Sequence, residues 1–197
     1  STAGLTPRIE SMQYDSSGRF MTKYINVLGF EDTYNYDYTL GVLLSKKNHF
    51  DQIFSYEYDG WQRKIKEKDF YNNYTQYSYE WITSGDFVNG IKLKIIDPSG
   101  LVKETYSDAW GRRRLERELS INNKWIDKKF EYDVQDRLFK VSDPYFSTNS
   151  PNRWTITEFD EYNRVKKLFL PTGSVVSTSY NGLNTTISDE SKTKTST

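Results

Sequence analysis

The chain has 197 residues, and its 27 basic and 27 acidic side chains cancel, so no net field favours nucleic acid or an anionic membrane surface. It has no cysteine, which excludes a disulfide framework and thiolate metal sites, and no run of about 18 apolar residues that would span a bilayer. Aromatic residues make up 16% of a chain whose mean hydropathy is −0.81. This combination is typical of half-buried β-strands rather than of a conventional apolar core.

A tyrosine–aspartate unit recurs from the N-terminal part of the chain to its C-terminal part. In each unit an aromatic anchor is followed by Asp, a short turn and usually Arg. The positions of the repeat are Tyr14, Asp15, Gly18 and Arg19; Tyr36 and Asp37; Tyr58, Asp59 and Arg63; Tyr106, Asp108, Gly111 and Arg112; Tyr132, Asp133 and Arg137; Phe159, Asp160, Asn163 and Arg164; and Tyr180. Successive anchors are 22, 22, 48, 26, 27 and 21 residues apart, and Tyr79 would divide the longest gap. A period in the low twenties fits one hairpin with its connection and predicts a stacked repeat.

Each unit predicts a strand, a tight turn and a returning strand that begins at Arg. Asp at the first turn position can accept hydrogen bonds from the backbone, and the residue before Arg should adopt a left-handed conformation. Gly18, Gly111, Asp136 and Asn163 occupy that position and tolerate positive φ. Gln62 departs from the pattern, and Gly60 offers a shifted turn there. Further turns are expected at residues 72–73, 89–90, 97–100, 122–123 and 171–173.

Between the turns the side chains alternate with period two. Phe54, Tyr56 and Tyr58 fall on one face of a strand, and Ser55 and Glu57 fall on the other. This pattern predicts a sheet with an aromatic–aliphatic face and a charged face. The segment 112–119 is the one place where a short helical turn is compatible with the spacing. The expected fold is all-β, with repeated hairpins forming a long antiparallel sheet that curves because strands twist.

The expected domain organisation is one repeat body with short flanks. We interpret residues 1–11 as a lead-in with an incomplete repeat, 12–190 as the repeat segment, and 191–197 as a polar tail at which a fragment ends. The chain starts with Ser1 and shows no signal-peptide core, which also suggests a fragment.

The repeat resembles the RHS/YD-repeat family, in particular the bacterial shell proteins related to the B and C components of insecticidal toxin complexes. Besides the Tyr/Phe-Asp…Arg units, the resemblance is carried by the order 141–146, Trp154-Thr155, 159–164, 170–173 and 180–183, and it covers roughly residues 12–190. The resemblance implies a spiral β-cocoon that holds a toxic segment. It implies as partners the rest of the shell, the enclosed toxin and the secretion machinery, and as location the outside or surface of a bacterium.

Several residues could form chemical sites, and each has an ordinary structural explanation. Asp97-Pro98-Ser99-Gly100-Leu101 matches one half of the paired motif with which related shells cleave themselves, but the second copy is missing, so a turn is favoured. His49 is the only histidine and is expected at the surface. The basic segment 112–118 contains two glutamates and fits a solvated hairpin strand better than a phosphate site. No cofactor and no metal site is predicted.

The predicted function is therefore that of a non-enzymatic segment of a secreted YD-repeat shell. The alternative is a cell-surface adhesion or carbohydrate-binding repeat protein, in which exposed tryptophans stack on sugar rings. The candidate residues for that role are Trp61, Trp81, Trp110, Trp125 and Trp154.

Overall fold

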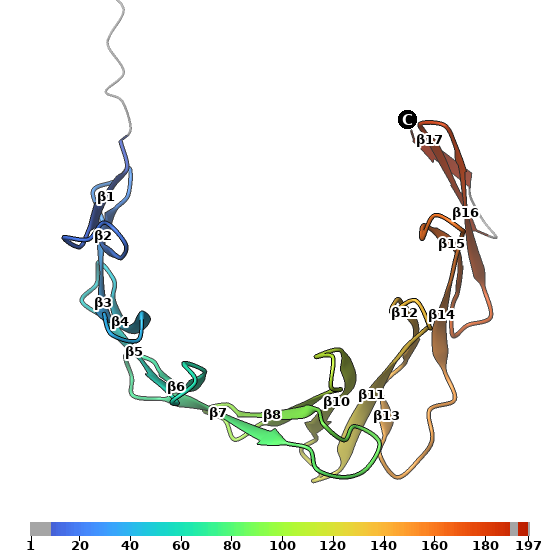
Figure 1. Cartoon of the computed structure of the whole chain (residues 1–197), viewed down its shortest axis with the longest axis horizontal. Helices are drawn as coiled ribbons and strands as arrows, with labels where there is room; N and C mark the ends of the chain where they lie inside the picture. Colours follow the sequence, from blue (N-terminus) through green and yellow to red (C-terminus); the bar gives the residue numbers. More distant parts are fainter. Residues whose placement is uncertain (1–8, 190–192, 197) are drawn as a thin grey trace, which may run out of the picture. The chain divides into compact units, whose positions relative to one another are not determined.

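The computed structural model describes residues 9–189 and 193–196, and in this part of the chain every regular element is a β-strand (Figure 1). The strands are β1 (Ser11–Tyr14), β2 (Met21–Ile25), β3 (Glu31–Asp37), β4 (Val42–Lys47), β5 (Ile53–Tyr58), β6 (Lys64–Lys68), β7 (Tyr74–Trp81), β8 (Ile91–Ile96), β9 (Val102–Ser107), β10 (Arg113–Leu119), β11 (Trp125–Tyr132), β12 (Leu138–Ser142), β13 (Tyr145–Phe146), β14 (Trp154–Phe159), β15 (Val165–Phe169), β16 (Val175–Asn181), β17 (Asn184–Ser188) and β18 (Thr193–Ser196). A helix long and apolar enough to cross a membrane is absent from the described residues.

The chain divides into two compact units. Unit 1 comprises Ser1–Ser78 and Ile95–Gly100, and unit 2 comprises Tyr79–Lys94 and Leu101–Thr197. In unit 1 each strand from β1 to β6 pairs antiparallel with the next one along the chain, and β6 pairs with the start of β7. In unit 2 the same order holds from β9 to β11 and from β14 to β18. The prediction of an all-β fold made of repeated antiparallel hairpins is confirmed.

One strand of unit 2 changes its partner halfway. The first part of β11 pairs with the short strand β13, whereas residues 130–132 pair with β12, which continues to β14. At the change of partner the backbone N–H of Lys129 donates to the hydroxyl of Ser142 at 2.8 Å. Ser142 is only 2% exposed, so this side chain replaces a ladder hydrogen bond in a place that water does not reach.

The sheet encloses very little purely apolar core. Among the described residues the buried hydrophobic side chains are Leu115 and Phe130. Most strand residues are half-buried, as a sheet without a second packed layer requires. The stability of each unit must therefore come largely from cross-strand pairs and from the turns.

The predicted separation into an aromatic face and a charged face is wrong. On the face of Tyr56, the residue directly opposite is Glu67, and Lys64 lies 5.8 Å from the Tyr56 ring centroid and 4.9 Å from that of Tyr77. Lys64 also pairs with Glu67 at 2.5 Å. Charged groups share the aromatic face because a cation over a ring and an ion pair beside it can both remain half-solvated.

Two further sequence-based expectations can be placed. Residues 113–119 form β10 and no helical turn, which agrees with the hairpin-strand interpretation of the basic segment. Residues 193–196, within the range predicted as a polar tail, form β18 and pair with β17. The other residues of that tail, and residues 1–8 of the predicted lead-in, lie outside the described residues.

Candidate functional site

The turns of the repeat share one backbone geometry. In the turn that starts at Asp133, its N–H donates to the carbonyl of Arg137 at 3.0 Å, and the N–H of Asp136 donates back to the Asp133 carbonyl at 3.0 Å. The turns that start at Asp59, Asp108 and Asp160 close in the same way. In each, the fourth residue is left-handed; these residues are Gln62, Gly111, Asp136 and Asn163, with φ of 63°, 77°, 67° and 63°.

The sequence predicted this left-handed position correctly except at one turn. Gln62 adopts positive φ like its counterparts, whereas Gly60 does not, so the expected shift of that turn is wrong. The hydrogen-bond pattern of the turn holds a residue in the left-handed region even where the side chain disfavours it.

The aromatic anchors sit beside a register shift of the hairpin. Such shifts occur where the strand meets the turn, as expected for a bulge that closes a type I turn. They lie next to Tyr14, Tyr36, Tyr58, Tyr132 and Phe159, and a further one lies between Arg113 and Leu115 opposite Tyr106. Tyr79, the proposed missing anchor, lies inside β7 and is followed by a loop closed between Ile82 and Gly90.

Within each complete unit the Asp side chain is saturated by hydrogen bonds. In the Asp133 turn, Oδ1 accepts the N–H of Gln135 at 2.9 Å and the N–H of Arg137 at 3.0 Å, and Oδ2 accepts Nε of Arg137 at 2.8 Å. Nη2 of Arg137 lies 2.7 Å from the same Oδ2, so the guanidinium grips the carboxylate with two nitrogens. The Arg side chain makes the same two contacts with Asp59, Asp108 and Asp160.

These contacts keep the carboxylates ionised. Burial raises the pKa of Asp108, but hydrogen bonds from the Arg112 side chain and from the N–H groups of Arg112 and Trp110 outweigh it, so the pKa lies below its ordinary 3.8. The pKa values of Asp59, Asp133 and Asp160 are lowered by the same balance. A carboxylate whose oxygens are both occupied and whose pKa is low is suited to fixing a turn and unsuited to donating a proton.

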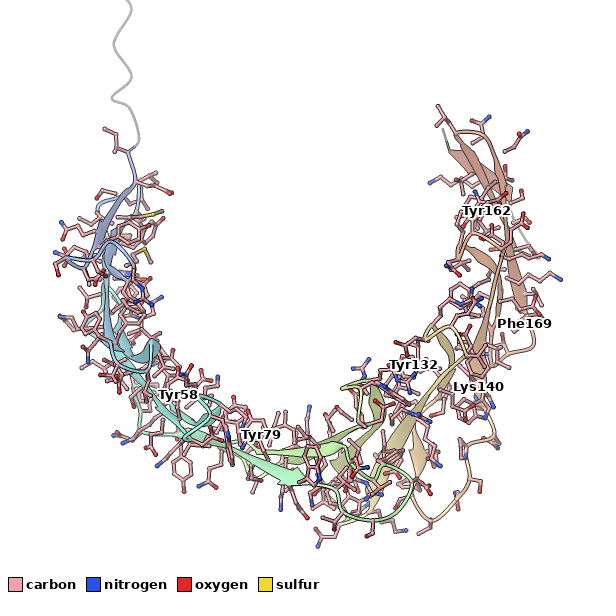
Figure 2. All side chains as sticks on the ribbon, in the orientation of Figure 1. Tyr58, Tyr79, Tyr132, Lys140, Tyr162 and Phe169 are labelled. Carbon is pink, nitrogen blue, oxygen red and sulfur yellow. The ribbon has the colours of Figure 1, made fainter. Side chains whose placement is uncertain are left out.

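The Arg of one unit also reaches the next unit, and this is the relationship that joins the repeats of unit 2. The guanidinium of Arg112 lies 4.9 Å from the Tyr132 ring centroid, and Arg112 pairs with Asp136 in the following turn. Arg164 lies 4.1 Å from the Tyr180 ring centroid. Tyr132 can be located in Figure 2 beside the turn that joins β11 to β12. Each Arg therefore binds its own Asp and covers the anchor of its neighbour.

The first two units depart from this arrangement. The turn at Asp15 is one residue longer, since its N–H donates to the carbonyl of Phe20, and the Arg19 guanidinium lies 5.2 Å from the Phe20 ring centroid. Asp37 accepts the N–H groups of Thr39 and Leu40, and Gly41 supplies the left-handed residue. The predicted positions thus form turns throughout, but the complete Asp–Arg arrangement begins at Asp59.

A second set of turns, at the opposite end of the strands, was only partly predicted. It begins at Asn26, Asn48, Asp69, Asp97, Ser120 and Leu170, and its left-handed fourth residues are Gly29, Asp51, Asn72, Gly100, Asn123 and Gly173. The recurrence of Asn or Asp about eleven residues after each repeat Asp, followed three residues later by Gly, Asn or Asp, is the signal that would have identified most of them.

The candidate chemical sites have structural roles. Oδ1 of Asp97 accepts the N–H of Ser99 at 2.9 Å and its hydroxyl at 2.6 Å, so Asp97 caps a turn. His49 is exposed, as predicted, and its ring stacks on Phe30 with 4.6 Å between centroids. Arg117 binds buried Asp127 through Nε at 3.1 Å and Nη2 at 3.0 Å, a pair that the sequence did not indicate.

The tryptophans fall into two groups. Trp61 and Trp110 are both 79% exposed and lie at the third position of their turns, with the Arg of the same turn 4.8 Å and 4.6 Å from the ring centroid. Trp81 is also exposed, whereas Trp125 and Trp154 are half-buried within strands. Tyr162, which Figure 2 labels, takes the same turn position as Trp110 and is 69% exposed. The turns that carry Asp and Arg therefore present aromatic tips to solvent.

No family model matches this sequence, and no curated protein matches it. Solved structures match in fold. The crystal structure of TcdB2-TccC3 aligns with 92% of this chain and 12% of its own, with 11% sequence identity and a TM-score of 0.69. The structure of TcdB2-TccC3 without hypervariable C-terminal region aligns with 92% of this chain and 14% of its own, with 11% identity and a TM-score of 0.72. This chain thus spans about an eighth of those chains, and the likeness at this identity is one of fold.

Proposed function

We propose that this chain is a non-catalytic structural segment of a YD-repeat (RHS) shell that encloses or carries a toxic polypeptide. The observation that carries the proposal is the double use of the repeat Arg. Arg112, Arg137 and Arg164 each hold the Asp of their own turn and cover the aromatic anchor of the next unit. The recurring residues are thus spent on continuity between hairpins, which is what a wall requires and what a reaction site does not.

The fold likeness to TcdB2-TccC3 supports the same proposal. It extends over 92% of this chain in both structures, so it involves the succession of hairpins as a whole and not one motif. One of those structures lacks a region described as hypervariable and C-terminal. A wall of constant hairpins with a variable C-terminal part is the organisation expected of a container with a replaceable content.

The partners and location follow from this proposal. The chain would contact the remainder of its shell and the enclosed toxic segment, and it would leave the bacterial cell with them through a secretion route. Neither a cofactor nor a nucleic acid has a role in it, since charges of both signs are paired along the strands and turns. Catalysis would belong to the enclosed polypeptide.

Electron microscopy of the longer protein that contains this segment tests the proposal, together with intact-mass measurement under denaturing conditions. A hollow particle that retains a separate C-terminal polypeptide is the expected result. A solid or extended particle made of one uncleaved chain would refute the container function.

The exposed tryptophans favour one second candidate, an adhesive or glycan-binding repeat protein. Trp61 and Trp110 each present an indole at a turn tip next to an Arg, a combination that suits stacking on a sugar ring. A glycan array probed with the chain and with Trp61→Ala/Trp110→Ala decides this question. Binding lost in the double variant would support adhesion, and absence of binding by the unchanged chain would remove it.

A further inference from the structure

Three successive turns of unit 1 present a bulky apolar side chain at the same position. Leu28, Phe50 and Tyr71 are the third residues of the turns that begin at Asn26, Asn48 and Asp69, and they are 67%, 70% and 73% exposed. These turns join β2 to β3, β4 to β5 and β6 to β7. Alternate turns of an antiparallel hairpin array lie at the same end of the strands, so the three side chains form one row, the tip row, along one edge of the unit.

The tip row is held in place by the first residue of each turn. Oδ1 of Asn26 accepts the N–H of Leu28 at 2.9 Å, and Oδ1 of Asn48 accepts the N–H of Phe50 at 3.0 Å. The third turn repeats this arrangement, with the N–H of Tyr71 2.9 Å from its cap oxygen. A side chain whose backbone is fixed in this way loses less entropy on docking than one on a mobile loop.

A hollow separates the first two tips. Its volume is about 300 Å³, and its lining includes Phe30, His49, Glu31, Lys47 and Asp51. The ring of His49 bridges the two turns, since its centroid lies 4.6 Å from that of Phe30 and 3.8 Å from that of the next tip. A hollow at the lower limit of ligand-site volumes suits one bulky side chain better than a large ligand.

The charges around the hollow cancel. Lys47 lies 2.8 Å from Asp51, and Glu31 lies 2.6 Å from Lys23. A charged partner would have to break one of these pairs, so the complementary group is uncharged. The edge therefore alternates exposed apolar tips with a hollow whose charges are paired.

We propose that the tip row docks against a second row of hairpin turns with apolar tips, each row placing its tips between those of the other. Strands lie about 4.8 Å apart, so the turns on one edge recur every two strands, at about 10 Å, and only another hairpin array has the same spacing. The three exposed tips would bury roughly 300–500 Å² on this side, below the ~800 Å² per partner of a standard stable complex. The partner row therefore fits a neighbour held in the same assembly, and this inference rests on the proposed shell.

The 197-residue chain itself supplies the probe, since its own tip row is a second row of the required kind. Sedimentation velocity from about 10 μM to 1 mM is compared for the unchanged chain, for Leu28→Ser/Phe50→Ser/Tyr71→Ser, and for the control Trp61→Ser, which removes an exposed aromatic residue from the opposite edge. Weak self-association that becomes at least about tenfold weaker in the triple variant and is unchanged in the control is expected. Circular dichroism of all three confirms an unchanged strand content.

Crosslinking locates the contact. Because the chain has no cysteine, Phe50→Cys introduces a single thiol, and Ser17→Cys provides the matched control on the opposite edge. Concentration-dependent dimers formed through Phe50→Cys alone are expected. No association up to 1 mM, or association that the triple variant retains, would overturn the inference.

Two further results keep the alternatives apart. Sedimentation with zwitterionic lipid vesicles that depends on the three tips would assign the row to a membrane surface and overturn docking between turns. A hollow particle from the longer protein with dispensable tips would refute this inference alone. Tip-dependent association without a hollow particle would refute the shell and leave the docking intact.

Discussion

The guanidinium of Arg137 lies 4.4 Å from the ring centroid of Phe159, the anchor of the next repeat, while its Nε remains bound to Asp133 of its own turn. Nη1 of the same side chain donates to Oδ1 of Asn163 at 2.7 Å. One residue therefore connects two turns and an anchor, and adjacent repeats should be coupled energetically as in other repeat proteins.

A double-mutant cycle measures this coupling. Arg137→Ala and Phe159→Leu together should cost less stability than the sum of the single changes, with a coupling of roughly 0.5–1 kcal/mol, because the stacking interaction can be lost only once. Chemical denaturation of the four proteins gives the value. Arg153→Ala in place of Arg137→Ala is the control, since Arg153 is exposed and pairs with Asp143, and its effect should add to that of Phe159→Leu. Additivity in both cycles would contradict the coupling.

Gln62→Gly should stabilise unit 1. Gln62 is held at a φ of 63°, where a residue with a side chain is strained and glycine is not. A gain of up to about 1 kcal/mol is expected, reduced by the greater freedom of glycine in the unfolded chain. Gly60→Ala serves as the control, since a Cβ at Gly60 meets no atom within 4 Å and its φ is not positive, so a neutral or slightly favourable effect is expected. The opposite order in thermal unfolding would show that the turn closes around Gly60.

Gly90→Ala should disrupt the loop that follows β7. A Cβ at Gly90 would lie 1.8 Å from the carbonyl oxygen of Ser107 and 2.8 Å from that of Phe87, and backbone atoms cannot yield as a flexible side chain can. A loss of about 3 kcal/mol is expected, the upper part of the usual range for overpacking. Urea unfolding measures it, and an unchanged midpoint would mean that the loop shifts freely.

Ser142→Ala tests the strand that changes its partner. The substitution leaves the N–H of Lys129 without an acceptor at a position where Ser142 is 2% exposed. The expected loss of stability is about 1–3 kcal/mol, the cost of an unsatisfied buried donor. Hydrogen exchange of the Lys129 amide, followed by NMR, should accelerate in the variant, and unchanged protection would show that water replaces the hydroxyl.

The saturated aspartates predict the response to acid. Because the pKa of Asp108 is lower in the folded chain than its ordinary 3.8, the ionised carboxylate stabilises the fold fully above that value, and this contribution is lost as the pH falls through the folded-state pKa. The melting temperature should therefore fall below about pH 4. Asp108→Asn should be less stable than the unchanged chain at pH 7 and should lose less between pH 5 and pH 2.5. Parallel pH profiles of the two proteins would contradict the assignment.

Much of the local structure could be predicted from the sequence. Asp at the start of a turn, followed three residues later by Gly, Asn or Asp, determined the turns at Asp108, Asp133 and Asp160, because those side chains cap the backbone and tolerate positive φ. Gln62 was misjudged because the flanking strands impose the turn geometry there against the preference of the residue.

By itself the sequence determined the strand class, the period and most of the turn chemistry, since all three depend on residues close together in the chain. Only the tertiary structure decided which ring each Arg covers, because strand register brings Arg137 to Phe159, 22 positions away. It also decided that Glu67 and Tyr56 face one another, since a residue's opposite neighbour is set by pairing and not by alternation within its own strand. The alignment of three turn tips along one edge likewise emerges only when the hairpins stand side by side.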